Sequence, residues 1–261
     1  MTNKPEISKI YEAYIQNENE ENRLVRYVGR EEYYSASGSG TCYRKHFYKI
    51  TKVEPTDPPD MVSNRIMRLG TVVHNDYEKA LKFLKNQNFK ISSSYSTINS
   101  SIYSSNIEQV HTEGEIKIPE YNVRGFYDAV FVMKTGEVYL YDFKTIRSYP
   151  YSLKFGHKKK ENWNKGKNID LHEKQIATYG IAVKEKFGRL DGMYLYYYNK
   201  DSSMCREVEV DMDYIEKVKE YWDDVIENTS GSIAPQVKEG TSPVYNWECK
   251  YCNFLTYCQE N

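Results

Sequence analysis

Two segments of the chain place carboxylates inside runs of apolar residues. Asp142 and Lys144 lie within the apolar segment 138–145, and Asp128 begins a second apolar run. Side chains alternate along a strand, so Asp142 and Lys144 point to one face and Phe143 to the other. Burying an acid and an amine costs free energy unless they pair or bind a metal. An isolated acid–x–lysine pattern is most simply a structural ion pair.

The turn between the two segments decides whether the two aspartates meet. If the hairpin loop is the three residues 134–136, Asp128 lies directly opposite Asp142. Gly136 suits the left-handed conformation that the third position of such a loop requires. A two-residue loop would instead place the two aspartates on opposite faces of the sheet.

Two opposed carboxylates remain ionised together only with a cation between them. Their hard oxygen atoms, together with substrate phosphates, suit Mg²⁺ or Mn²⁺. A lysine beside them can orient or help deprotonate a water molecule, and it can stabilise charge on phosphorus. Asp128, Asp142 and Lys144 therefore fit the hydrolysis of a phosphodiester.

Two helical features extend this set of residues. His74 falls on the apolar side of a long helix expected to begin near Ser63. A lone histidine there is usually a hydrogen-bonded core residue, but it could also bind the metal. Gln175 and Tyr179 are four residues apart on a helix expected over 170–187, so they share a face. The simpler interpretation is a solvated glutamine and a packed tyrosine.

The order of elements along the chain predicts an α/β fold. A helix, three strands, a second helix and a further strand indicate a mixed sheet with helices on both faces. The expected strands cover residues 114–118, 123–132, 138–145, 193–198 and 206–210. A final helix is expected over 213–227.

Four motifs in order resemble those of the PD-(D/E)xK nuclease superfamily, and of its RecB-like branch in particular. They are Gly70…His74, Gly125…Asp128, Asp142-Phe143-Lys144 and Gln175…Tyr179. The resemblance implies a restriction-endonuclease-like sheet and a metal held by His74, Asp128, Asp142 and the Phe143 carbonyl. It assigns Lys144 to the catalytic water or transition state, and Gln175 and Tyr179 to the substrate strand or the site geometry. Glu113 and Glu115, just upstream, are further candidates for the site, although a structural role is the simpler expectation for both.

The five cysteines are unevenly distributed. Cys249, Cys252 and Cys258 crowd into the last thirteen residues with the spacing C-x2-C-x5-C. Three thiolates do not close a tetrahedral site, so a fourth ligand must come from Cys42 or Cys205. From spacing alone, zinc and an iron–sulfur cluster both remain open.

The resemblance favours the cluster. The iron–sulfur members of the RecB-like branch, the AddB-type and CRISPR-associated exonucleases, are similar in having one upstream cysteine and this C-terminal spacing. That implies a [4Fe–4S] cluster bound by Cys42, Cys249, Cys252 and Cys258, with zinc as the second choice and Cys205 a core or edge residue. The expected organisation is a helical N-terminal region (1–60), a nuclease core (61–230) and a cysteine tail (231–261), the cluster joining the two ends.

Composition excludes several classes of protein. The 36 basic and 37 acidic residues give a net charge of −1, which argues against coating nucleic acid through bulk charge. No run approaches ~18 apolar residues, so we expect no membrane partner. An odd cysteine count without an apolar signal core indicates a reducing compartment, the cytoplasm, or the host cytoplasm for a virus-encoded chain.

The resemblance also suggests a substrate. The iron–sulfur relatives thread single-stranded DNA, so we expect a metal-dependent exonuclease that prefers single-stranded DNA. The lysine-rich segment 154–167 with Trp163 would by default be a solvated loop, but its place before the Gln175 helix suits backbone tracking. The alternatives are a structure-specific endonuclease or flap nuclease, and a non-catalytic nucleic-acid-binding module. Because no Walker A motif is present, the expected partner is a separate helicase or a recombination or CRISPR adaptation protein.

Overall fold

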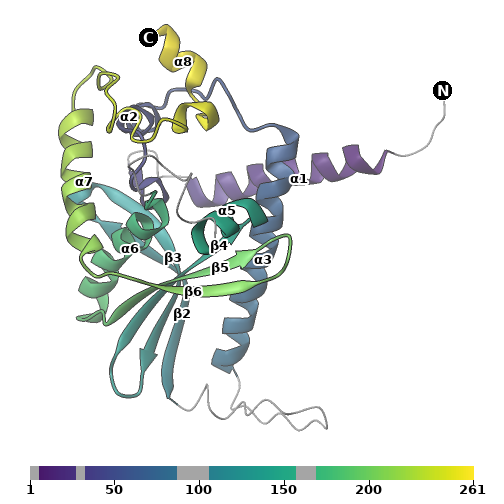
Figure 1. Ribbon diagram of the computed structural model, residues 1–261, viewed down its shortest axis with the longest axis vertical. Coiled ribbons are helices and arrows are strands. Elements are labelled where there is room, and N and C mark those ends of the chain that lie inside the picture. The colour runs from purple at the N-terminus through teal and green to yellow at the C-terminus, as the bar shows by residue number, and fades with distance from the viewer. Residues whose placement is uncertain (1–5, 28–32, 87–105, 157–168) are drawn as a thin grey trace. The chain divides into compact units, whose positions relative to one another are not determined.

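A computed structural model describes residues 6–27, 33–86, 106–156 and 169–261 (Figure 1). The chain divides into two compact units. The first contains residues 1–34, 41–71 and 228–261, and the second contains residues 35–40 and 72–227. None of the helices in these described ranges is long and apolar enough to cross a membrane.

The second unit is built on a mixed sheet whose strands run in the order β1-β3-β4-β5-β6, with β2 also paired to β3 (Figure 1). The strands are β1 (Tyr34–Ser35), β2 (Ile107–Ile118), β3 (Val123–Met133), β4 (Val138–Ile146), β5 (Gly192–Asn199) and β6 (Cys205–Val210). The pair β4–β5 is parallel, whereas β2–β3, β3–β4 and β5–β6 are antiparallel. Parallel neighbours require a crossover, and helices α5 (Ser148–Phe155) and α6 (Leu171–Phe187) lie within it.

Helices cover both faces of this sheet, as the element order predicted. On one face lies α6, whose Ile176 and Val183 are fully buried. Asp142 and its neighbours at alternate positions of β4 are buried on that side, consistent with strand alternation. On the other face, Tyr77 of α3 (Met61–Asn86) packs against Phe143 and Tyr196. A last helix, α7 (Tyr214–Thr229), contributes the buried Trp222, whose Nε1–H donates to Thr178 Oγ1.

The turn between β3 and β4 has the three-residue form that the sequence predicted. The Met133 N–H donates to the Glu137 carbonyl at 2.9 Å, and Gly136 adopts a φ of 93°. A left-handed residue is tolerated there because glycine has no Cβ. This loop fixes the register of the two strands that carry Asp128 and Asp142.

Several element boundaries differ from the sequence expectations. Helix α3 begins at Met61 because the Asp60 carboxylate accepts the Ser63 N–H at 2.7 Å, so the cap is Asp60 and not Ser63. Strand β2 begins at Ile107, seven residues before the expected strand. Of the lysine-rich segment 154–167, residues 154–155 end the unexpected helix α5, and residues 157–167 lie outside the described residues.

The first unit joins segments from both ends of the chain. It contains α1 (Ile7–Tyr27), α2 (Tyr43–Ile50), the start of α3, the 3-10 helix η4 (Glu248–Tyr251) and α8 (Leu255–Glu260). Phe47 and Tyr48 of α2 form its core with Phe254. The Asp57 carboxylate accepts the backbone N–H and the hydroxyl of Thr256 at 2.8 and 2.9 Å. The three-part division of the sequence at residues 60 and 230 stays a prediction.

Candidate active site

Three carboxylates form a row across neighbouring strands of the sheet. Glu113 lies on β2, and the strand pairs on either side of it place it directly opposite Asp128 of β3. The β3–β4 register in turn places Asp128 opposite Asp142. Residues opposite each other in adjacent strands have Cβ atoms about 4.5–5.5 Å apart. The sheet of the second unit therefore holds three acids close together.

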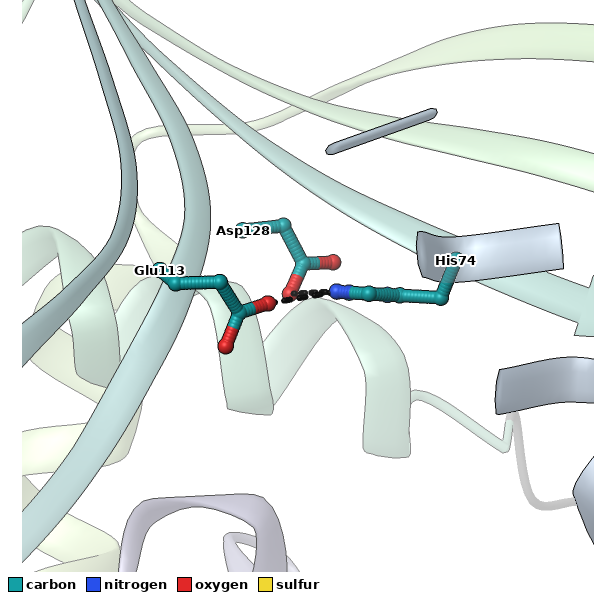
Figure 2. Close-up of side chains that lie close together, drawn as sticks. All are labelled: His74, Glu113 and Asp128. Carbon is teal, nitrogen blue, oxygen red and sulfur yellow. Dashed lines mark hydrogen bonds and ion pairs between the residues drawn. The ribbon is translucent and has the colours of Figure 1, made fainter. Parts of the chain in front are cut away.

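A histidine from α3 completes the group (Figure 2). His74 Nε2 lies 2.5 Å from Glu113 Oε1 and 3.6 Å from Asp128 Oδ1. The imidazole and the two carboxylates point toward one another, and their ligand atoms lie within 4.8 Å of each other. His74 is thus not a packed core histidine, because its ring nitrogen faces two acids.

The electrostatics of the group favour bound protons until a cation replaces them. The hydrogen bond with Glu113, and then the charge of Asp128, raise the pKa of His74 above its usual value. Burial, and then the charge of Asp142, raise the pKa of Asp128 well above that of a free aspartate. The Phe143 N–H donates to Asp128 Oδ2 and partly opposes this rise.

These donor atoms fit a divalent cation. Two carboxylates and an imidazole converge on one point, and carboxylate oxygens are the ligands that Mg²⁺ and Mn²⁺ prefer. The third acid, Asp142, is 2% exposed, and its Oδ2 has no hydrogen-bond partner among the described residues. A cation would remove the repulsion that raises the pKa of Asp128.

Lys144 is held beside this group by the helix α6. Its Nζ lies 2.5 Å from Asp142 Oδ2, without the alignment of a hydrogen bond, and 2.9 Å from Gln175 Oε1, to which it donates. The Gln175 amide in turn donates to the Tyr179 hydroxyl at 2.8 Å. Gln175 is therefore not a solvated residue: it connects the lysine to the buried Tyr179.

The glycine of the second motif allows this packing. A Cβ on Gly125 would lie 2.7 Å from the Ala36 Cβ and 3.1 Å from Tyr179 Cε1. The first distance is shorter than real Cβ contacts, so a side chain at 125 would push Tyr179 or the segment of Ala36 away from β3. Gly125 thus lets Tyr179 lie close to β3, which keeps the hydrogen-bonded residues Lys144, Gln175 and Tyr179 in position.

The two further candidates on β2 differ in their surroundings. Glu115 forms an ion pair with Arg124. Glu113 instead faces His74 and has a φ of 49°, a conformation uncommon outside glycine and found at functional sites. Its place could not be counted from the sequence, because an irregular 3-10 turn at Pro119–Tyr121 joins β2 to β3.

Four cysteines line a cavity of about 200 Å³ in the first unit: Cys42, Cys249, Cys252 and Cys258. Cys205 is exposed on β6 in the second unit, where its sulfur lies 3.6 Å from the Tyr77 hydroxyl. Burial, and secondarily the charge of Glu248, raise the pKa of Cys42 to about 11. The same Glu248 carboxylate fixes the cavity wall by accepting the backbone N–H groups of Cys42 and Tyr245 at 3.0 and 2.9 Å.

The chain thus combines a mixed α/β sheet with a group of acids and a histidine that could hold a metal ion. The model of the PD-(D/E)XK nuclease superfamily matches residues 45–259. The chain therefore belongs to the PD-(D/E)XK nuclease superfamily.

One solved structure agrees at the level of the fold. The crystal structure of SSO0001 superposes with a TM-score of 0.56 at 21% identity and covers 97% of each chain. LHK-Exo, an alkaline exonuclease from Laribacter hongkongensis, gives a TM-score of 0.45 at 14% identity over 77% of this chain and 90% of its own. No curated protein sequence matches the chain.

Proposed function

We propose that the protein is a Mg²⁺- or Mn²⁺-dependent deoxyribonuclease, specifically an exonuclease that prefers single-stranded DNA. The observation that carries the hydrolytic function is the row of Glu113, Asp128 and Asp142 across three strands, with His74 at one end and Lys144 beside it. A non-catalytic binding module would not require three acids and a lysine in one buried cluster, since such a cluster costs folding free energy.

Each residue has a distinct role in the proposed reaction. His74, Glu113 and Asp128 would hold the cation, and Asp142 and the Phe143 carbonyl stay predicted ligands. When bound, the cation would lower the pKa of a water molecule and polarise the phosphate.

Lys144 would hold the attacking water or stabilise charge at phosphorus. The Gln175 oxygen fixes its ammonium group at 2.9 Å, and burial of Tyr179 fixes Gln175 in turn. Gln175 and Tyr179 therefore serve the geometry of the site in this proposal.

The single-strand preference rests on the resemblance to the iron–sulfur members of the RecB-like branch. The lysine-rich segment 154–167 is consistent with contacts to a phosphate backbone. Lys154 at its start forms an ion pair with Glu173 near the N-terminus of α6. We further propose a separate helicase or recombination or CRISPR adaptation protein as the partner, because the chain lacks a motor motif of its own.

We also propose that Cys42, Cys249, Cys252 and Cys258 bind a [4Fe–4S] cluster. The shared cavity supports Cys42, and not Cys205, as the fourth ligand. The choice of an iron–sulfur cluster over zinc rests on the resemblance to the iron–sulfur members of the RecB-like branch.

Degradation of labelled DNA tests the proposed activity. End-labelled linear single-stranded DNA and, separately, circular single-stranded DNA are incubated with the protein and Mg²⁺ or Mn²⁺, with and without chelator. Loss of linear DNA alone supports the exonuclease, and cutting of the circle supports an endonuclease or flap nuclease on the same fold. Binding without cleavage in either metal would contradict the proposal. Lys144→Ala serves as the low-activity control, and Lys186→Ala on α6 as the matched surface control.

A further inference from the structure

A buried arginine lies beside the cysteine cavity of the first unit. Arg44 and Tyr48 are one helical turn apart on α2, and they are 7% and 2% exposed. Both line the cavity together with Cys258. Burying a guanidinium is unfavourable unless its N–H groups find acceptors, and the hydrolytic site does not use this charge. Its acceptors therefore indicate what it does.

Two nitrogens of the arginine donate to one hydroxyl. Arg44 Nε and Nη2 donate to the Tyr48 hydroxyl at 2.9 and 2.5 Å, and Nη1 donates to the Pro235 carbonyl at 2.9 Å. A tyrosine hydroxyl offers two lone pairs and one proton. With both lone pairs facing Arg44, the hydroxyl can engage a further partner only by donating its proton.

The sulfur of Cys258 is the acceptor that the structure places beside Tyr48. Cys258 packs against the core that contains Tyr48, and both side chains line the cavity. The ring is fixed by edge-on packing against Tyr257 and a tilted contact with Phe254.

We propose that Tyr48, oriented by Arg44, donates an O–H···S hydrogen bond to Cys258 and thereby tunes the metal centre held by the four cysteines. The inference rests on the proposed cysteine-bound cofactor. Tyr48 is a positioning residue, since it acts through a ligand. Hydrogen bonds to a ligating sulfur and a nearby cation withdraw charge from the thiolate, which favours the more reduced, more negative state of the centre.

Potentiometry of the iron-loaded protein tests the proposal. Tyr48→Phe removes the hydroxyl and leaves the ring packing in place. We expect the midpoint reduction potential to become more negative, with a change of roughly tenfold in the reduction equilibrium, or ~59 mV for one electron. Tyr257→Phe is the matched control, a phenol of the same core that should leave the potential unchanged. Equal potentials in wild type and Tyr48→Phe would overturn the proposal.

A measurement on the unaltered protein covers the case in which Tyr48→Phe does not fold. Exchange into D₂O replaces the hydroxyl proton, so the iron–sulfur stretching bands in resonance Raman spectra should shift if that proton is bonded to a ligating sulfur. Arg44→Lys, which keeps the charge but loses the paired donors, should give a smaller change in potential than Tyr48→Phe. Unshifted bands in D₂O would contradict the hydrogen bond.

Failure of the cofactor proposal is distinguishable from failure of this one. Iron and sulfide analysis of the purified wild type settles which metal is present before any variant is compared. If the metal is zinc, cobalt substitution gives sulfur-to-cobalt absorption bands, and Tyr48→Phe should shift them while Tyr257→Phe should not. Bands that stay in place in both variants would overturn the role of Tyr48 for zinc as well.

Discussion

Replacing Asp128 with asparagine should stabilise the metal-free protein, although it should abolish cleavage. Asp128 is 11% exposed at its side chain, lies opposite Asp142, and has a pKa raised by burial and by that neighbouring charge. At about 5 Å and an effective dielectric constant of ~20, two carboxylates repel by about 3 kcal/mol. Attraction to His74 and Lys144 offsets part of this repulsion. The net gain from Asp128→Asn should be about 1–2 kcal/mol, or ~2–8 °C in Tm.

The effect should depend on pH with a definite sign. A carboxyl whose pKa is raised on folding stabilises the folded state most below its unfolded pKa of about 4, and this contribution is lost as pH rises through the folded pKa. Wild type and Asp128→Asn should therefore have similar Tm values near pH 4. Their difference should grow toward pH ~8, because only the wild type carries the ionised acid there.

Asp142→Asn is the matched comparison. Its carboxylate contacts the ammonium of Lys144, which is 13% exposed, so removing the charge leaves a buried amine poorly paired. Breaking such a pair costs ~3–5 kcal/mol, and relief of the repulsion with Asp128 recovers part of it, so a net loss of about 2 kcal/mol is expected. Scanning fluorimetry in chelator measures both variants. A loss of stability in Asp128→Asn as large as that in Asp142→Asn at pH ~8 would show that repulsion does not dominate at Asp128.

Substitutions and metal titration test the acidic site and the cysteine cavity separately. Lys144→Ala should retain the fold and lower the rate of DNA cleavage by roughly 10²–10³-fold, measured with end-labelled DNA; a variant as active as wild type would exclude its role at phosphorus. The affinity for Mn²⁺, measured by calorimetry, should rise with pH across neutrality. The ion must displace protons from His74 and Asp128, and the pKa values of both groups are raised. An affinity that does not change with pH would argue against binding at these residues. Cys42→Ser should lose bound iron while Cys205→Ser keeps it, and the opposite result would move the fourth ligand to β6.

The sequence was most informative where chemistry and local geometry coincide. Alternation along β4 places Asp142 and Lys144 on one face, and Gly136 predicts the loop that sets Asp128 opposite Asp142. Both inferences need only the strand period and a hairpin rule, so they could be made without a structure. The mixed sheet with helices on both faces was predictable for a similar reason.

Contacts that depend on irregular segments were not predictable. Glu113 reaches His74 because a 3-10 turn and a left-handed residue set the β2–β3 register, and no sequence rule counts through that turn. The hydrogen bonds that join Lys144, Gln175 and Tyr179 form only when helix α6 packs against the sheet. The Arg44–Tyr48 pair can be recognised on a helix from its spacing, but its neighbour Cys258 lies 210 positions after Tyr48 in the sequence.

Anomalous scattering from Mn²⁺-soaked crystals would locate the divalent metal that these acids are proposed to hold. We expect an anomalous peak within ligand distance, about 2.0–2.6 Å, of His74 Nε2 and of carboxylate oxygens of Glu113 and Asp128. The peak should vanish in Asp128→Asn. Manganese bound only elsewhere, with His74 still hydrogen-bonded to Glu113 at saturating metal, would rule out a metal site at these residues.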